Sequence, residues 1–251
     1  MKLARDTWLI LQYEAGLLIK NPVNIAISLV QPLTYLLLFT PFLGSVMEVP
    51  EYGNAFEIYV PSLMSAMGLF SGLFAGFAML ASIRQGVVNR CRVTPLSRVG
   101  LVLGRELLYV LLTGFQAIVV TVTAFAFGLR VPPINFLFAL GILSLMVLIS
   151  VAISYCLALL MPTENSLVQL INGISNPLSL LAGVLIPLSV APLWIQNVAL
   201  WNPFAWGTNG MRAIFQGQLG NAVVWQSALI LTVLAVLAVG GSSRMFTRSI
   251  A

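Results

Sequence analysis

Six apolar stretches dominate the sequence, and each is long enough to cross a lipid bilayer as an α-helix. A spanning helix needs about 20 predominantly apolar residues. Of the 251 residues, 59% are hydrophobic and only 8% are charged, whereas an ordinary soluble domain is about 25% charged. A water-soluble fold of this size could not bury so much apolar surface. The sequence therefore predicts an all-α polytopic membrane protein whose single domain covers residues 1–251.

Short polar connections separate the six predicted transmembrane helices. These spans cover residues 23–43, 58–82, 107–129, 134–160, 166–186 and 223–240. Residues 187–221 contain Pro187, Pro192 and Pro203 and several tryptophans, and neither half of this segment is long enough to cross. We therefore expect short re-entrant or outer helices there, before the last span.

Residues 1–22 have mixed polarity and differ from the spans. Their apolar residues at helical spacing are Ala4, Trp8, Leu11, Ala15 and Leu18. This spacing predicts an amphipathic helix that lies in the membrane interface. The alternative is an ordinary charged leader before the first span.

The distribution of lysine and arginine predicts the orientation of the chain. Residues 83–106, between the second and third spans, hold five of the twelve basic residues. With six spans, ten basic residues fall on that side, and only Arg130 and Arg212 fall on the other. Because cytoplasmic segments are enriched in lysine and arginine, we expect residues 83–106 and both chain ends to be cytoplasmic. A five- or seven-span arrangement would place the basic tail outside and weaken this bias.

The residue types present exclude several kinds of site. The chain has no histidine, so it has no histidine metal centre and no catalytic pair built on histidine. Its only lysines are Lys2 and Lys20, and neither follows a glycine, as the lysine of a phosphate-binding P-loop does. Ionisable residues such as Glu106 fall near predicted span ends, which disfavours a proton-coupled carrier. We expect no catalytic residue, metal or cofactor in this chain, and no nucleic-acid partner.

The fifth predicted span is the most polar. One helical face of this span carries Asn165, Gln169, Asn172 and Asn176. Such a face is suited either to lining a substrate path or to forming hydrogen bonds with neighbouring helices.

The second predicted span carries two sets of residues at regular spacing. Its small residues, four positions apart, are Gly68, Gly72 and Gly76. They predict close helix packing, either within the bundle or against another subunit. Its aromatic residues are Phe70, Phe74 and Phe77, which are placed to contact a hydrophobic substrate or the lipid.

Two motifs are similar to those of a known transporter family. Residues 93–98 read Val-Thr-Pro-Leu-Ser-Arg and precede Gly104-Arg105, as in the family's coupling-helix region. The stretch before the last span holds Ala182-Gly183, Pro187, Pro192-Leu193, Pro203 and Arg212, in the order of the family's signature. With the amphipathic leader and the polar fifth span, these motifs resemble the membrane-spanning subunit of ABC-2-type (type V) ABC exporters. The daunorubicin-resistance permeases are the most similar members. Where members often have acidic residues, this chain has Arg84-Gln85-Gly86.

The resemblance implies an assembly driven from outside the chain. Two such subunits, identical or paralogous, would pair with two separate ABC ATPase subunits that bind ATP and Mg. A coupling helix after the second span and the interfacial helix would receive the ATPase movement, and the second and fifth spans would line the path. The residues implied in ATPase contact are Arg90, Arg92, Thr94, Pro95, Leu96, Ser97 and Arg98. The arginines would equally serve to set topology and to bind anionic membrane lipids.

The predicted function is therefore that of a permease subunit without its own nucleotide-binding site. It would export a hydrophobic or amphipathic substrate, drug-like or lipid, across a bacterial inner or plasma membrane, as in multidrug efflux and antibiotic resistance. The alternatives are an exporter of polysaccharide or lipid-linked sugar, a secondary carrier or channel, and a membrane enzyme or scaffold.

Overall fold

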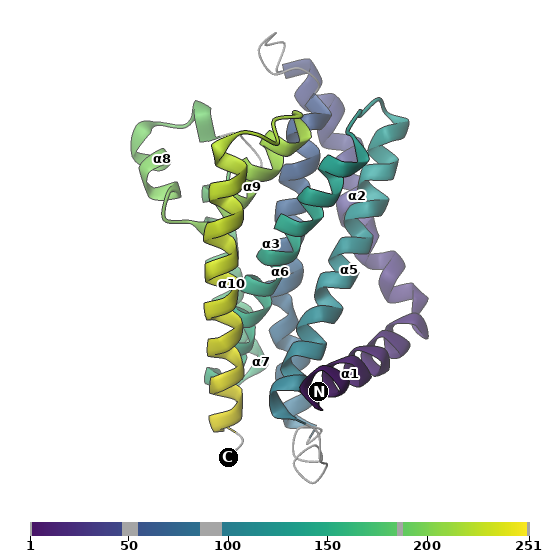
Figure 1. Cartoon of the computed structure of the whole chain (residues 1–251), viewed down its shortest axis with the longest axis vertical. Coiled ribbons are helices and arrows are strands. Elements are labelled where there is room, and N and C mark those ends of the chain that lie inside the picture. Colours follow the sequence, from purple (N-terminus) through teal and green to yellow (C-terminus); the bar gives the residue numbers. More distant parts are fainter. Residues whose placement is uncertain (1, 47–54, 86–96, 185–187, 250–251) are drawn as a thin grey trace.

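The described part of the chain is built from helices that run side by side. The computed structural model describes residues 2–46, 55–85, 97–184 and 188–249, and no β-strand occurs among them. Most of the long helices lie along the longest axis of the molecule, and α1 (Lys2–Ile19) lies across one end (Figure 1). The predicted all-α fold is confirmed.

The remaining elements follow in chain order. They are α2 (Pro22–Val46), α3 (Ala55–Arg84), α5 (Arg98–Ala126), α6 (Pro133–Leu160), α7 (Glu164–Leu181), the 3-10 turn η2 (Leu188–Val190), α8 (Leu193–Ala199), α9 (Pro203–Phe215) and α10 (Ala222–Ser249). In position, α1 corresponds to the predicted interfacial helix. The predicted spans correspond to α2, α3, α5, α6, α7 and α10.

Among the described residues, four helices are long and apolar enough to cross a membrane, namely α3, α5, α6 and α10. The pair of α1 and α2 is a further candidate, and the two helices meet at a bend of 82°. Pro22 opens α2, and because the ring of proline cannot continue a preceding helix, it ends α1. In contrast, α7 is not among these candidates, because its polar face lowers its hydropathy.

The close contact between α3 and α6 forms the centre of the bundle. A Cβ atom at Gly72 would lie 3.1 Å from both the carbonyl oxygen of Val147 and the amide nitrogen of Val151. A Cβ atom at Gly76 would lie 2.8 Å from the carbonyl oxygen of Ser154, and the N–H of Gly76 donates to the Ser154 hydroxyl at 2.8 Å. The glycine stripe therefore packs within this chain, against α6, and lets the two backbones approach closely.

The third long helix begins earlier than the sequence predicts. Residues 98–106 belong to α5, although the predicted span starts at residue 107. The helix starts there because Ser97 is an N-cap, whose hydroxyl accepts a hydrogen bond from the N–H of Gly100 at 3.1 Å. The last helix is also longer than predicted, since α10 continues to Ser249.

The two short helices before α10 differ in burial. On α8, Leu193 and Trp194 are exposed. On α9, Phe204, Met211 and Ile214 are buried, and this helix packs against α3, α6 and α10. The end of the bundle opposite α1 therefore has one exposed short helix and one that is inserted among the long helices (Figure 1).

Candidate functional site

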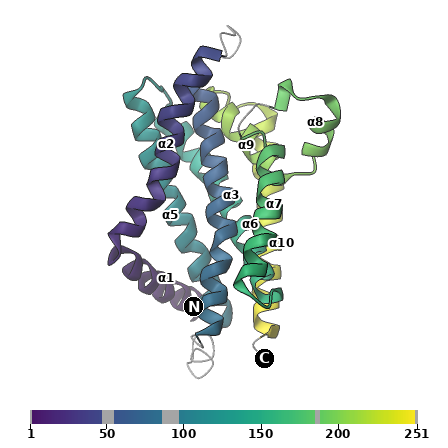
Figure 2. The same ribbon diagram turned by 180° about the vertical axis from the view of Figure 1, so that it is seen from behind.

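The polar face of α7 points away from the bundle. Its members Asn165, Gln169, Asn172 and Asn176 are all exposed. The opposite face, with Leu167, Ile171 and Ser175, is buried, and α7 packs along α3 (Figure 2). Burying an amide in hydrocarbon without a partner is costly. In a membrane, these side chains therefore need water or a second polypeptide beside them, and their role in a substrate path stays a prediction.

The three phenylalanines of α3 have different surroundings. Phe70 and Phe77 are partly buried and pack against the core. Phe74 is exposed and stacks on Phe77, with ring centroids 5.7 Å apart and an interplanar angle of 26°. Phe74 is thus the one of the three that is best placed to meet a substrate or lipid, and that contact stays a prediction.

The predicted coupling segment, residues 83–106, is described only at its two flanks. Arg90, Arg92, Thr94, Pro95 and Leu96 lie outside the described residues, as does the side chain of Arg98. Their role in ATPase contact therefore stays a prediction. Ser97 is described, and it caps α5 as noted above.

The first flank of the segment contacts the beginning of α7. Arg84, at the end of α3, donates from Nη2 to the carbonyl oxygen of Pro162 at 2.6 Å. Its Nη1 lies 3.8 Å from Oε1 of Glu164, the first residue of α7. The hydroxyl of Thr163 caps the same helix by accepting from the N–H of Ser166 at 3.1 Å. The end of α3 is therefore attached to the helix with the polar face.

The second flank of the segment contacts α1. The N–H of Ser97 donates to Oδ2 of Asp6 at 2.9 Å. Nε of Arg105 donates to Oε1 of Glu14 at 2.8 Å, and these side chains are only 13% and 20% exposed. A Cβ atom at Gly104 would lie 2.8 Å from Cγ2 of Ile10, so the two helices are in close contact. Helix α1 is thus held against the first two turns of α5.

The polarity of α1 differs from the single apolar face that the sequence predicts. Asp6 and Glu14 face α5 through the bonds just described, while Trp8, Leu9 and Tyr13 are exposed. Leu11, which the predicted face groups with Trp8, is buried. The carboxylates lie inward because they have partners on α5. Exposed apolar side chains are what a helix in the membrane interface presents to lipid.

Sequence reasoning missed a buried carboxylate in α5. Glu106 is fully buried, and its Oε1 accepts a hydrogen bond from the hydroxyl of Ser242 on α10 at 3.1 Å. Its Oε2 has no hydrogen-bond partner among the described residues. Because α5 begins at Arg98, Glu106 is about two turns inside the helix, and it does not lie just before a span as the predicted start at residue 107 implied. The Ser97 cap was the signal that could have revealed this.

Arg212, which the sequence places in the segment of short re-entrant or outer helices, is buried on α9. Its Nε and Nη2 donate to the hydroxyl of Ser62 on α3 at 3.0 and 2.7 Å. Nη2 also donates to the carbonyl oxygen of Gly183 at 2.5 Å. Gly183 has φ +70°, which favours glycine at this position. Arg212 therefore connects α9, α3 and the segment after α7.

The amino-acid sequence is similar to those of known membrane proteins. The chain is 24% identical over 204 residues to the ycf38 transport permease of Cyanophora paradoxa, a match that covers 78% of this chain and 69% of the relative. It is 24% identical over 200 residues to the ycf38 transport permease of Porphyra purpurea, with the same coverage of both chains. The family described as ABC-2 type transporter matches residues 5–215, which run from α1 to the end of α9. The match includes the leader, both flanks of the coupling segment, the polar helix and the short helices, and the chain belongs to the ABC-2 type transporter family of membrane permeases.

Proposed function

We propose that this chain is the membrane-spanning subunit of an ATP-driven exporter, and that a separate ABC ATPase energises it. Membership of the ABC-2 family implies a partnership with such an ATPase. The observation that carries the proposal is the attachment of the two coupling-segment flanks. Arg84 joins one flank to the start of α7, and Ser97 and Arg105 join the other to α1. A push on this segment therefore acts on two different parts of the bundle.

The proposed mechanism is a rigid-body movement of packed helices. The ATPase subunits bind ATP and Mg, close on each other, and displace residues 86–96. The displacement reaches α7 through Arg84 and reaches α1 through Asp6 and Glu14. Because α1 meets α2 at the 82° bend, movement of α1 is transmitted to a helix along the bundle axis. The helices have two arrangements in this mechanism. The ATPase can shift the equilibrium between the two arrangements only if it binds one of them more tightly than the other.

We further propose that the active unit contains a second copy or a paralogue of this chain. The exposed amides of α7 support this, since they need a polar environment that the described part of one chain does not provide. The substrate would be a hydrophobic or amphipathic molecule, drug-like or lipid, that leaves the cytoplasm of a bacterial cell across its inner or plasma membrane. Multidrug efflux and antibiotic resistance are the corresponding physiological roles.

A secondary carrier is the second candidate function, and buried Glu106 favours it. Carboxylates within spanning segments are typical of proton relays, and Glu106 lies inside α5. The two functions are separated in liposomes that contain this chain with or without the ATPase. Transport that needs ATP and both proteins supports the exporter. Transport by this chain alone, down a proton gradient, would support the carrier and contradict the exporter.

Charge reversal in the coupling segment is expected to separate ATP hydrolysis from transport. The variant carries glutamate at Arg90, Arg92 and Arg98, and it should either lose the ATPase on co-purification or hydrolyse ATP without transport. The control reverses two other basic residues, Arg244 and Arg248, which are exposed and lie at the end of α10. Both variants are compared for membrane insertion, ATPase recovery and transport per ATP. Full coupling in a correctly inserted triple variant would contradict the assignment of this segment.

Asn172→Leu is expected to change substrate preference without changing assembly. The residue is exposed on α7, so the substitution removes a polar group without disturbing the buried face. The relative transport rates of a polar and an apolar substrate should shift by about tenfold, which corresponds to about one lost hydrogen bond. Asn197→Leu on exposed α8 is the control. A change in assembly or thermal stability alone would show that Asn172 has a packing role.

A further inference from the structure

Both acidic residues of α1 are used inside the molecule. The carboxylate of Asp6 accepts a hydrogen bond from the N–H of Ser97, and that of Glu14 accepts one from Nε of Arg105. These bonds turn the negative charges of α1 toward the start of α5. Asp6 and Glu14 are the only acidic residues at positions 1–22, so every carboxylate of this segment has a partner on or beside α5.

The basic residues of the same segment are exposed instead. Neither Arg5 on α1 nor Lys20, which directly follows the helix, has an ion-pair partner among the described residues. Leu9 and Gln12 are exposed between them at helical spacing, so these four residues form one outer face of α1. Because an α-helix rises about 1.5 Å per residue, the two cations are about 22 Å apart along the axis and cannot share one small anion.

Large apolar and aromatic side chains are exposed on and around this outer face. They are Leu3, Trp8, Leu9, Tyr13, Leu17 and Ile19. Apolar side chains gathered on an exposed surface mark contact with a membrane or another protein. Basic residues interleaved with tryptophan and leucine are typical of helices that lie on anionic lipid, so the charge and the apolar content of the outer face both fit a lipid surface.

The position of α1 along the bundle places the outer face at the boundary between lipid and water. The apolar span within α5 begins at Val99, and α1 contacts Ser97 and Arg105, on either side of that point. The helix lies across the end of the bundle, and α2 continues from it along the bundle after the 82° bend (Figures 1 and 2). It is therefore level with the end of a span, which is the depth at which tryptophan and lipid headgroups meet.

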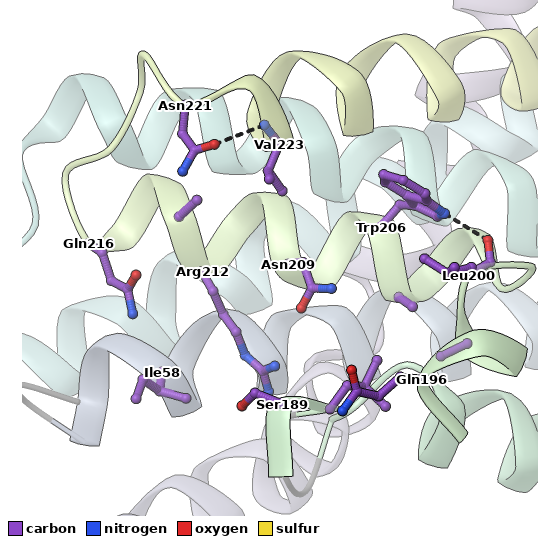
Figure 3. Close-up of a pocket in the computed structure, with 14 residues that line it drawn as sticks. Ile58, Ser189, Gln196, Leu200, Trp206, Asn209, Arg212, Gln216, Asn221 and Val223 are labelled. Carbon is purple, nitrogen blue, oxygen red and sulfur yellow. Dashed lines mark hydrogen bonds between the residues drawn. The ribbon is translucent and has the colours of Figure 1, made fainter. Parts of the chain in front are cut away.

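The buried arginine at the other end of the bundle is not comparable. Arg212 lines a cavity of about 460 Å³, and Figure 3 shows its side chain extending from α9 into that region. Its guanidinium already donates to the Ser62 hydroxyl and the Gly183 carbonyl oxygen. The charge of Arg212 is therefore used within the bundle, whereas the cations of the outer face of α1 are directed at the surroundings of the protein.

We propose that the outer face of α1 binds the anionic headgroups of membrane lipids. Arg5 and Lys20 contact separate headgroups, and Trp8 and Tyr13 lie among the headgroups with them. The surface is distinct from the coupling segment and from the polar face of α7, and lipid binding to it does not depend on an ATPase.

Lipid binding should also favour the contact between α1 and α5. In the docked arrangement Asp6 and Glu14 are paired with α5, so the lipid meets the cations of the outer face. If α1 left α5, both carboxylates would lose their partners and would repel the same lipid. An anionic lipid therefore binds the docked arrangement more tightly and shifts the equilibrium toward it.

Quenching of Trp8 fluorescence by brominated lipid tests the proposal. The full chain is reconstituted in vesicles of phosphatidylcholine with a small fraction of brominated phosphatidylglycerol or brominated phosphatidylcholine. The contribution of Trp8, which is 58% exposed, is the difference between wild type and Trp8→Phe. Half-maximal quenching should need about tenfold less brominated phosphatidylglycerol than brominated phosphatidylcholine, since each cation near an anionic membrane strengthens the attraction about fivefold. Equal quenching by both lipids would overturn the proposal. Quenching by neither would also overturn it, because protein or water would then cover this face.

A double variant tests the two cations. Arg5→Gln with Lys20→Gln should remove the preference for phosphatidylglycerol while both brominated lipids still quench Trp8. The matched control is Arg244→Gln with Arg248→Gln, which removes the same charge from exposed positions on α10 and should keep the preference. Equal losses in the two variants, or a loss in neither, would contradict the assignment of Arg5 and Lys20.

The link to docking is measured by the exposure of a buried position of α1. Ile10 is buried in close contact with Gly104 of α5. An Ile10→Cys chain that also carries Cys91→Ser and Cys156→Ala is labelled with N-ethylmaleimide in vesicles with and without phosphatidylglycerol. Phosphatidylglycerol should slow the labelling severalfold, and adding Arg5→Gln with Lys20→Gln should abolish that difference. The same slowing in the presence of both substitutions would show that lipid bound at the outer face does not hold α1 against α5.

Discussion

Gly72→Ala is expected to lower the free energy of unfolding by about 2–3 kcal/mol, through overpacking of the contact between α3 and α6. A Cβ atom at this position would collide with the Ser150 side chain and would lie 3.1 Å from the backbone of Val147 and Val151. Backbone atoms in the middle of α6 cannot move aside as the end of a flexible side chain can. Gly72→Leu should therefore abolish recovery of the folded protein.

Gly114→Ala is the matched control for this substitution. Gly114 also lies within a long helix, α5, but a Cβ atom there would meet nothing within 4 Å. Since alanine is a better helix former than glycine by about 0.5–1 kcal/mol, the control should be neutral or slightly stabilising. Thermal unfolding in detergent and recovery after size-exclusion chromatography measure both variants. Equal stability of the two would mean that the glycine stripe does not set the distance between α3 and α6.

Reversal of one charge in the pair Glu14 and Arg105 is expected to cost about 3 kcal/mol, because it leaves a mostly buried charge beside one of the same sign. Glu14→Arg or Arg105→Glu alone should release α1 from α5. With the ATPase present, such a variant should continue to hydrolyse ATP while transport falls. The double exchange, Glu14→Arg with Arg105→Glu, should recover much of both stability and transport.

The exposed ion pair at the other flank provides the comparison. Arg84 and Glu164 are 45% and 53% exposed and 3.8 Å apart, so reversing Glu164 should cost less than about 1 kcal/mol. Unfolding free energies of the single and double variants give the coupling energy of each pair. If the double exchange at positions 14 and 105 restores neither the stability nor the transport lost in the single variants, the contact between α1 and α5 does not depend on this ion pair.

The helical fold could be predicted because the relevant information is local. A run of about 20 apolar residues predicts a spanning helix whatever surrounds it, and α3, α5, α6 and α10 meet that expectation. Family membership was likewise predictable from motifs at residues 93–98 and 182–212, and the family match confirms it. Helix boundaries were less predictable. The start of α5 depends on a single capping serine, Ser97, inside a basic segment whose charge suggested a loop.

The candidate site was only partly predictable. The amide stripe of α7 follows from the helical period, and its exposure agrees with a surface that faces something other than its own bundle. The burial of Glu106 and Arg212 could not be predicted, because it depends on other parts of the chain. Glu106 contacts α10. Arg212 contacts α3 and the segment after α7. The inward orientation of Asp6 and Glu14 on α1 was missed for the same reason, since a hydrophobic stripe on one helix does not reveal which polar residues have partners elsewhere.

Amino-acid order alone was sufficient to establish a helical membrane protein of the ABC-2 family, because apolar length, basic bias and short motifs are properties of single segments. Tertiary structure decided which polar groups meet. Two pairs connect the coupling segment to α1, Asp6 with Ser97 and Glu14 with Arg105, and the partners in each pair are 91 residues apart in the chain. Arg212 and Ser62 are 150 residues apart. Such pairs form because a charge or donor removed from water must find a partner. Which partner lies within reach is set by the packing of the whole bundle, so no pattern within one segment could identify it.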